Sequence, residues 1–305
     1  TPSVDAQVQS SVLTAFAVGR LQRFTRSGFR RLPTENLDAC LATMPEKDSC
    51  SWPVVKVWTP FDAFFWPQGR FFRGNPARIE VVSPPRLSES DFWGRSALGL
   101  SLKRLAWDKR LIPAIAFANQ RGLPEVFNER LHARSGSEYL LFVHDDVWLD
   151  DYFLADRVID GLGAFDVIGV AGNRRRVPGQ PAWAFVGRNA EGRFIWDDKE
   201  FLSGAVAHGA KPFGAISMFG KAPAECELLD GVFLAARRSI LHAHGLRFDP
   251  SFDFHFYDLD LCRSARAAGL RLGTWPVAMT HQSGGAFGSA GWLQGLKKYL
   301  AKWEG

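Results

Sequence analysis

An uninterrupted run of apolar and aromatic residues, Tyr139–Val143, leads directly into the polar segment His144–Asp146. Such a run is typical of a strand that is buried on both faces of a parallel sheet. Acids at the carboxyl end of a buried strand lie where open α/β sheets bind their ligands. Because two adjacent carboxylates repel each other and are costly to desolvate, they require a compensating cation. The alternative is an acidic turn in which Asp150 or Asp151 caps the next helix.

Strand-like and helix-like segments alternate from Ala77 onward. The expected strands are 79–83, 114–118, 139–143, 165–171 and 271–278, with a further strand after Asp230–Gly231, helices at 96–105, 123–133 and 259–268, and a hairpin of 182–186 with 193–196. The Gly-rich stretch 201–223 is expected to be a loop. Alternation of this kind predicts an α/β fold with a mainly parallel sheet built of right-handed crossovers. The strand ends at Ser83–Pro84, Asn119 and Asp145–Asp146 then converge on one edge, which is the predicted nucleotide crevice.

A second acidic cluster precedes the helix at 259–268. Asp258 is expected at or beside its N-cap, where backbone N–H groups and the helix dipole favour an ionised carboxylate. Together with Asp145–Asp146 and His281 it predicts an oxygen-rich site with one imidazole, which suits Mn²⁺ or Mg²⁺ better than a structural zinc. Such a metal would offset charge on a departing phosphate, and Asp258 would be free to act as a general base. The alternatives are that Asp258 is only an N-cap and that His281 is a structural residue at a strand end.

Two regions are expected, an N-terminal appendage at 1–76 and the main domain at 77–305. The appendage combines a helix-like segment, a basic turn and a stretch rich in prolines and aromatics. The net charge of +5 is concentrated in residues 1–36, which fits a peripheral contact with an acidic membrane surface, a phosphate-bearing partner or a solvated helix face. No nucleic-acid motif accompanies it, so no nucleic-acid partner is expected.

The predicted compartment is the cytoplasm, with a peripheral contact at the inner face of the membrane. No apolar run approaches the roughly 18–20 residues that span a bilayer, and no secretory signal pattern opens the chain. Cys40, Cys50, Cys226 and Cys262 show no C-x-x-C spacing. We expect them to be reduced thiols, with Cys226 and Cys262 buried.

The order of these motifs resembles that of the GT-A fold glycosyltransferases. It is most similar to the family 2 type, in the branch that includes streptomycin-biosynthesis-like enzymes. The matching segments are Ala118–Asn128, Phe142–Val147, Leu229–Arg238 and Phe256–His281 within a resemblance that covers residues 78–300. The resemblance implies a GT-A (Rossmann-like) fold in which helices flank the sheet.

The resemblance also implies a donor site. Ser83, Pro84 and Asn119 would contact the nucleoside, and Asp145 would contact the ribose or uracil. Residues Asp230 and Gly231 would lie near the donor sugar or the acceptor.

Metal and base positions follow from the same resemblance. Asp146 would be the metal-ligating acid of the D-x-D motif, with His281 as a second ligand. Asp258 matches the second acid of the family's E-D pair and would be the catalytic base.

The sequence departs from the family pattern in two places. His144 occupies the first Asp of D-x-D, which puts the usual ribose or metal contact there in doubt. Tyr257 replaces the acid before the base, so Asp260 and Asp253 remain rivals to Asp258.

We therefore predict a metal-dependent glycosyltransferase of the hexosyltransferase type. It would move a sugar from a nucleotide-diphospho sugar, with a UDP-sugar favoured, to a hydroxyl acceptor with inversion. The expected acceptor is a growing surface glycan (lipopolysaccharide or capsule) or a lipid-linked sugar.

Two alternatives remain. A sugar-phosphate nucleotidyltransferase should carry a Gly-rich, basic loop after its first strand, whereas segment 83–88 is proline-rich. A non-catalytic carbohydrate- or nucleotide-sugar-binding protein with a degenerate transferase fold is favoured by His144. It is disfavoured by the presence of Asp146, Asp258 and His281.

Overall fold

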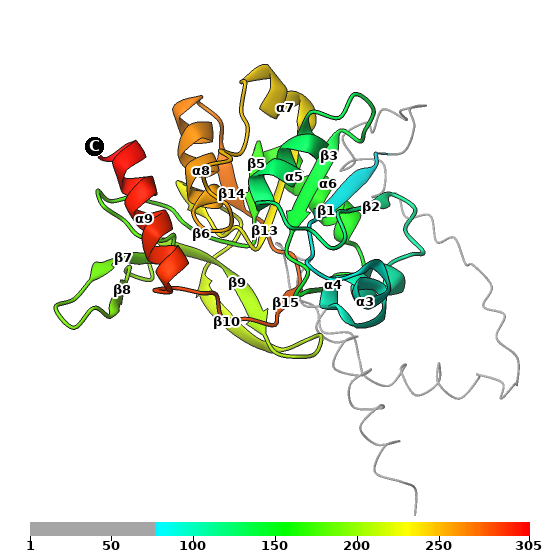
Figure 1. The fold of residues 1–305 in the computed structure, drawn as a ribbon, viewed down its shortest axis with the longest axis horizontal. Helices are drawn as coiled ribbons and strands as arrows, with labels where there is room; N and C mark the ends of the chain where they lie inside the picture. Colours follow the sequence, from blue (N-terminus) through cyan, green and yellow to red (C-terminus); the bar gives the residue numbers. More distant parts are fainter. Residues whose placement is uncertain (1–76) are drawn as a thin grey trace, which may run out of the picture. The chain divides into compact units, whose positions relative to one another are not determined.

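The computed structural model describes residues 77–305 and confirms the predicted α/β class, with a large sheet flanked by helices. Within these residues the main sheet has the strand order β11-β14-β5-β13-β3-β1-β2 (Figure 1). Its strands are β1 (Ile79–Ser83), β2 (Leu111–Ile115), β3 (Tyr139–Val143), β5 (Val167–Gly169), β11 (Ala224–Cys226), β13 (Phe233–Arg237) and β14 (Leu272–Thr274). The appendage predicted at 1–76, including Cys40 and Cys50, lies outside the described residues.

The main sheet is mixed. Strand β1 runs parallel to β2 and β3, and β14 runs parallel to β5. Strand β13 lies antiparallel between β3 and β5, and β11 is antiparallel to β14. The parallel crossovers expected from the sequence therefore hold for β1, β2 and β3, whose carboxyl ends share one edge.

A second sheet lies beside the first, with the strand order β12-β6-β9-β15-β4 and β10 paired to β9. Its strands are β4 (Val147–Leu149), β6 (Ala171–Asn173), β9 (Leu202–His208), β10 (Ala215–Gly220), β12 (Leu228–Leu229) and β15 (Met279–His281). The predicted hairpin is confirmed as β7 (Phe185–Arg188) and β8 (Phe194–Trp196).

The prediction of a loop at 201–223 is wrong, because this stretch forms β9 and β10. Its glycines serve close packing between strands. At Gly204, with φ +92°, an added Cβ would lie 1.9 Å from the carbonyl oxygen of Val170. The strand predicted at 165–171 likewise divides, since Val170 separates β5 from β6, and the one predicted at 271–278 contains only β14.

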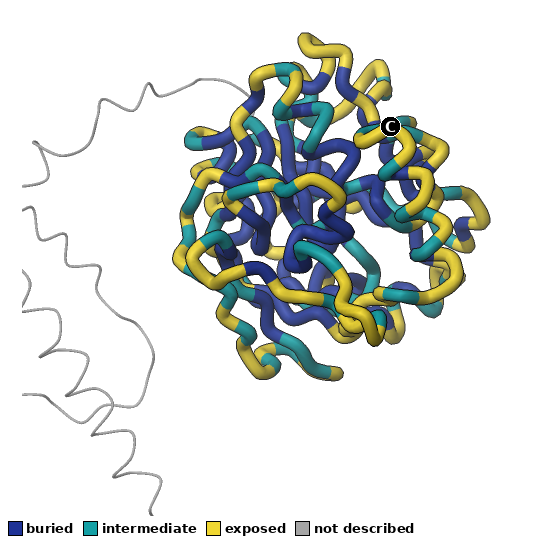
Figure 2. Tube along the Cα trace, turned by 90° about the vertical axis from the view of Figure 1, so that its left-hand side faces the viewer, coloured by how far each residue is buried: buried dark blue, intermediate teal, exposed yellow. Residues whose placement is uncertain are grey.

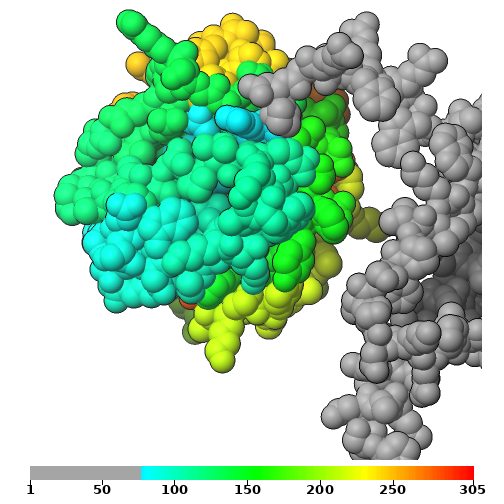
Figure 3. Space-filling view, turned by 90° about the vertical axis from the view of Figure 1, so that its right-hand side faces the viewer, coloured from blue at the N-terminus to red at the C-terminus, as the bar shows by residue number. Residues whose placement is uncertain are grey.

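Helices pack against both sheets, with α5 on β1, α6 on β5 and β13, α8 on β12 and β14, and α4 on β4. They are α3 (Glu89–Arg95), α4 (Ala97–Arg104), α5 (Leu123–Leu131), α6 (Leu154–Ala164), α7 (Arg238–Ala243), α8 (Tyr257–Ala267) and α9 (Ala290–Trp303). The predicted helix at 96–105 is α4, which begins where the Ser96 hydroxyl accepts a hydrogen bond from Gly99 N at 2.9 Å. In Figure 3 the first described elements, coloured cyan to green, cover most of one side of the molecule.

The core lies between the sheet and these helices. Figure 2 shows buried segments gathered in the interior, with exposed segments around them. Every residue of β1 is buried, and Phe142 on β3 packs against Phe127 of α5 and Phe248, with ring centroids 4.8 and 4.9 Å apart. Burial of each such side chain contributes about 1.5–3 kcal/mol. Cys226 and Cys262 are buried free thiols, as predicted. Among the helices of residues 77–305, none combines the length and the apolar character that a bilayer crossing needs.

Candidate metal centre and adjoining cavities

Three potential metal ligands meet at the junction of the two sheets. One ligand atom from each of His144, Asp146 and His281 lies within 4.8 Å of the others. His144 and Asp146 belong to the link between β3 and β4, and His281 ends β15, which pairs with β4. The structure therefore brings the predicted pair Asp146 and His281 together and adds His144, which the sequence had left in doubt.

Backbone contacts from three elements hold this link. His144 N donates to Val232 O at 3.3 Å, the Asp145 carbonyl accepts from Leu98 N at 3.1 Å, and the Asp146 carbonyl accepts from Gln282 N at 3.0 Å. The polar groups at the end of β3 are therefore placed by the residue before β13, by α4 and by the residue after β15.

Asp146 is held in its ionised form. Burial opposes its ionisation, but a hydrogen bond from His281 and electrostatic interactions with the imidazoles of His281 and His144 lower its pKa to about 2. His281 Nε2 lies 3.3 Å from Asp146 Oδ2 and 3.0 Å from Ser283 Oγ. Burial and the Asp146 charge raise the pKa of Asp145 instead.

The donor set contains one carboxylate and two imidazoles, so it is richer in nitrogen than the sequence predicted. Mg²⁺ binds oxygen ligands almost exclusively, whereas imidazole suits transition metals. These three residues could therefore hold a divalent metal ion. Three protein ligands leave further coordination positions open for oxygens of a ligand.

One cavity, which we call cavity A, lies at the carboxyl ends of β1 and β3 and has a volume of about 500 Å³. Four predicted site residues, Ser83, Pro84, Asn119 and Asp145, line it. The Ser83 hydroxyl is buried and has no hydrogen-bond partner among the described residues. A buried polar group without a partner is costly, so Ser83 is suited to a hydrogen bond with a ligand.

Asn119 shapes the wall of cavity A. The strand predicted at 114–118 is β2, which ends earlier, at Ile115, so Asn119 lies in the loop that follows it. Its Nδ2 donates to Arg121 O at 2.7 Å and its Oδ1 accepts from Arg121 N at 3.2 Å. Two of the four hydrogen bonds that its side chain can make therefore organise this loop.

The second cavity, cavity B, has a volume of about 410 Å³ and shares His144, Phe254 and His281 with cavity A. Asp230, Gly231 and Asp258 line it. Nine of the lining residues are phenylalanine, tyrosine or tryptophan: Trp183, Phe185, Trp196, Phe219, Phe254, Phe256, Tyr257, Phe287 and Trp292. None of the described residues that line it is a lysine or an arginine.

Asp258 lies in the first turn of α8, close to the predicted place at or beside the N-cap. The N-cap is Phe256, which makes no side-chain cap, and Asp258 Oδ2 accepts a hydrogen bond from Gly231 N at 2.9 Å. Burial, together with the charge of Asp230, raises the pKa of Asp258 to about 7. The expectation that Asp258 stays firmly ionised is therefore wrong, because the cavity and Asp230 outweigh the backbone hydrogen bonds.

Gly231 approaches Asp258 and Tyr257 too closely for a side chain. An added Cβ would lie 2.7 Å from Tyr257 Oη and 2.8 Å from Asp258 Cβ. Tyr257 Oη donates to Gly231 O at 2.8 Å and lies 2.9 Å from His144 Nε2. Burial raises the pKa of Tyr257 well above its ordinary value, so its hydroxyl keeps its proton.

The rival acids lie elsewhere. Asp260 accepts hydrogen bonds from Trp303 Nε1 at 2.7 Å and pairs with Lys302 at 2.7 Å, so it faces α9. Asp253 lines cavity A and does not line cavity B.

The sequence left open that Asp150 or Asp151 caps the next helix, which is α6. The N-cap residue of α6 is instead Phe153, which makes no side-chain cap hydrogen bond. Asp150 is buried and accepts from Thr280 Oγ1 at 2.6 Å and Phe213 N at 3.0 Å. Asp151 alone contacts the start of the helix, through Phe153 N at 2.8 Å.

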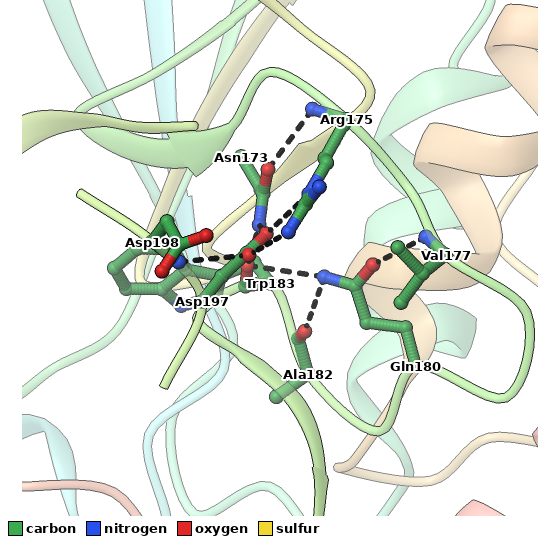
Figure 4. A network of polar contacts seen from close by, with 8 residues as sticks. All are labelled: Asn173, Arg175, Val177, Gln180, Ala182, Trp183, Asp197 and Asp198. Carbon is green, nitrogen blue, oxygen red and sulfur yellow. Dashed lines mark hydrogen bonds and ion pairs between the residues drawn. The ribbon is translucent and has the colours of Figure 1, made fainter. Parts of the chain in front are cut away.

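A buried polar network supports one wall of cavity B (Figure 4). Asn173 Nδ2 donates to Asp197 Oδ2 at 2.8 Å and to Trp183 O at 2.9 Å, and Arg175 forms an ion pair with Asp197. Gln180 Nε2 also donates to the carbonyls of Ala182 and Trp183. These bonds fix the backbone that carries Trp183 into the cavity.

Sequence reasoning missed His208 and the aromatic wall. His208 ends β9 within the stretch predicted as a loop, and its ring centroid lies 6.2 Å from that of His281. The predicted hairpin places Phe185 and Trp196 on cavity B. The apolar segment Leu202–His208 was the available signal for β9, whereas nothing local indicates which cavity the hairpin lines.

Comparison with known proteins gives distant similarities only. No protein-family model and no curated protein matches the sequence. Among solved structures, GalNAc-T7 with UDP, GalNAc and Mn²⁺ has a TM-score of 0.41 and 11% identity over 73% of this chain and 47% of that chain. The mannosyltransferase PcManGT from Pyrobaculum calidifontis, in complex with GDP-Man and Mn²⁺, has a TM-score of 0.38 and 12% identity over 74% of this chain and 63% of that chain.

A 4-diphosphocytidyl-2C-methyl-D-erythritol synthase from Anaerococcus prevotii has a TM-score of 0.37 and 8% identity over 74% of this chain and 100% of that chain. The chain thus spans about half of GalNAc-T7 and less than two thirds of PcManGT. Similarities this weak carry no argument about activity, so the proposals below rest on the residues of this chain.

Proposed function

We propose that this protein is a metal-dependent glycosyltransferase that uses a nucleotide-diphospho sugar. One observation carries the proposal: His144, Asp146 and His281 lie together where cavity A and cavity B adjoin. A nucleotide-sugar transferase needs this order of parts, with a nucleoside pocket, a cation for the diphosphate and a separate acceptor pocket with a base.

Cavity A is the proposed nucleoside pocket. Ser83 offers an unpaired hydroxyl, Asn119 and Pro84 form the wall, and Asp145 lies at the metal side. A bound Mn²⁺ would offset the negative charge of a diphosphate, which is the chemistry a Lewis acid supplies to a departing phosphate. The preference for a UDP-sugar remains a prediction from the family resemblance.

Asp258 is the proposed general base. Its pKa of about 7 is near the value at which a base is both deprotonated and strong enough to accept a proton. It lines cavity B, so an acceptor hydroxyl bound there could reach it. Attack assisted by one base, with no covalent intermediate, implies inversion at the anomeric carbon.

Cavity B is the proposed acceptor pocket, and its lining favours an uncharged sugar ring. Aromatic faces pack on the C–H faces of sugars, and Asp230 and Asp258 would repel a phosphate that no lysine or arginine of the lining could offset. A growing surface glycan fits this lining. A lipid-linked acceptor fits only if its phosphates lie outside cavity B. Cytoplasmic location and a membrane contact through the basic N-terminal residues remain predictions from the sequence.

The test is calorimetric titration of UDP and GDP, with and without Mn²⁺. We expect Mn²⁺ to tighten binding of one nucleotide in the wild type, and Asp146→Ala to weaken that binding by at least about tenfold. Asp151→Ala is the matched control, because Asp151 contacts Phe153 and Arg157 rather than the metal group. Metal-independent binding would contradict the proposed role of the metal. Absence of binding under every condition would favour a non-catalytic protein.

A further inference from the structure

We infer that His144 is the third metal ligand and binds through Nδ1, because Tyr257 holds its Nε2–H. Tyr257 is then a positioning residue for the metal centre. The inference rests on the proposed function, since it concerns the same centre, but it makes a separate prediction about one hydroxyl group.

The direction of each hydrogen bond follows from counting protons. The carbonyl of Gly231 can only accept, so Tyr257 Oη, 2.8 Å away, uses its single proton to donate to it. His144 Nε2 lies 2.9 Å from the same hydroxyl oxygen and must therefore donate to it. A neutral imidazole carries one N–H, so the lone pair of Nδ1 is left free.

A free lone pair on a fixed ring is what a metal ligand requires. Ligating histidines almost always donate their other ring N–H to a second group, which fixes the tautomer and the orientation of the ring. Phe254 stacks on His144, with ring centroids 5.8 Å apart and planes 26° apart, and restrains the ring from its face. Tyr257 restrains it from its edge.

The two departures from the family pattern explain each other. His144 and Tyr257 are 113 positions apart in the sequence, and their side chains are joined by a hydrogen bond. An ionised acid at position 257 would accept a hydrogen bond from the histidine but would have no proton to donate to Gly231 O at neutral pH. The tyrosine hydroxyl does both, so a histidine at 144 and a tyrosine at 257 form a matched pair.

Gly231 connects this pair to the proposed base. Its carbonyl accepts from Tyr257, and its N–H donates to Asp258 Oδ2 at 2.9 Å. Since a Cβ at this position would clash with both side chains, glycine is required there. One residue thus sets the positions of the metal ligand and of the base relative to each other.

The experiment removes only the hydroxyl. Tyr257→Phe keeps the ring that packs between Phe127 and Phe248, with centroids 5.7 and 6.0 Å away. Tyr299→Phe is the matched control, because it removes another buried hydroxyl, on α9, that has no partner among the described residues. Mn²⁺ binding is measured by calorimetry without nucleotide, and the His144 tautomer by ¹⁵N NMR of the metal-free full chain.

We expect Tyr257→Phe to weaken Mn²⁺ binding by about 10–100-fold, as removal of outer partners of metal ligands generally does. His144 should be the Nε2–H tautomer in the wild type and a mixture of tautomers in Tyr257→Phe, while Tyr299→Phe behaves as wild type. Unchanged Mn²⁺ affinity in Tyr257→Phe, or an Nδ1–H tautomer in the wild type, would overturn the inference.

The same data separate this inference from the proposed function. If Mn²⁺ binding depends on Asp146 but not on Tyr257, the proposed metal centre stands and only the role of the pair is wrong. If the wild type binds no Mn²⁺, both are wrong.

Discussion

Replacing Asp258 with Asn should make the protein more stable at pH 8 while removing its activity. The fold raises the pKa of Asp258 from 3.8 to about 7, first through burial and then through Asp230. A difference of one in pKa corresponds to about 1.4 kcal/mol, so the ionised carboxylate costs the native state at most about 4 kcal/mol. Because Asp258 lines a cavity and keeps some contact with water, we expect about 2–4 kcal/mol.

The direction of the pH dependence of stability follows from the number of protons that the native and unfolded states bind. Between pH 4 and 7 the native state keeps the Asp258 proton while the unfolded state has lost it, so wild-type stability falls as pH rises through this window. An amide cannot ionise. The gain in Asp258→Asn should therefore be largest at pH 8 and less than half as large at pH 5.

Urea unfolding of the metal-free protein at pH 5 and pH 8 measures this difference. Asp249→Asn is the matched control, because Lys302 and neighbouring groups lower the pKa of Asp249 despite its burial. That substitution should destabilise the protein at pH 8. Equal effects of Asp258→Asn at both pH values would refute the reasoning from burial and charge.

The same variant tests the proposed base. Turnover should fall by about 10²–10⁴-fold in Asp258→Asn, with nucleotide binding retained. In the wild type, turnover should rise with pH up to about pH 7, as Asp258 loses its proton. Near-normal turnover in the variant, or a product that keeps the donor's anomeric configuration, would contradict the assignment.

Two further substitutions test the supporting structure by urea unfolding. Gly231→Ala should lower the unfolding free energy by about 1–3 kcal/mol and also reduce turnover, because the added Cβ would press on Tyr257 and Asp258. If this variant were as stable as the wild type, the backbone at position 231 would be able to shift. Asp197→Ala should cost about 1–3 kcal/mol, because it leaves buried partners of the network unpaired. The neighbouring Asp198→Ala should change stability by less than about 0.5 kcal/mol, and equal losses in the two would count against the network.

Local patterns predicted part of this molecule correctly. Strand β3 has the predicted bounds, because a fully apolar run before a polar turn leaves few other conformations. Asp146 and His281 were also predicted to meet, and the structure places their side chains 3.3 Å apart. The first prediction depends on adjacent residues, whereas the second depends on motifs that lie far apart in the sequence and whose order resembles that of a known family.

The remaining features depend on contacts between distant segments. The pKa of Asp258 is set by Asp230 and by the cavity, so a helix-start pattern could not give it. The glycines of 201–223 suggested a loop, although Gly204 and Gly220 allow close approach of other backbone segments. The hydrogen bond between His144 and Tyr257 joins the two residues at which the sequence departs from the family pattern.

The chain passes from the main sheet to the second sheet within three residues, His144–Asp146, between β3 and β4. His281 comes from the far side of this junction, on β15. The centre therefore exists only while both sheets are folded and docked. Partial opening of the second sheet would scatter the ligands while the main sheet stayed intact. A bound metal ion would oppose such opening, because it would bind only while the two sheets are docked. The fraction of protein that holds metal would therefore report on how cooperatively the two sheets fold.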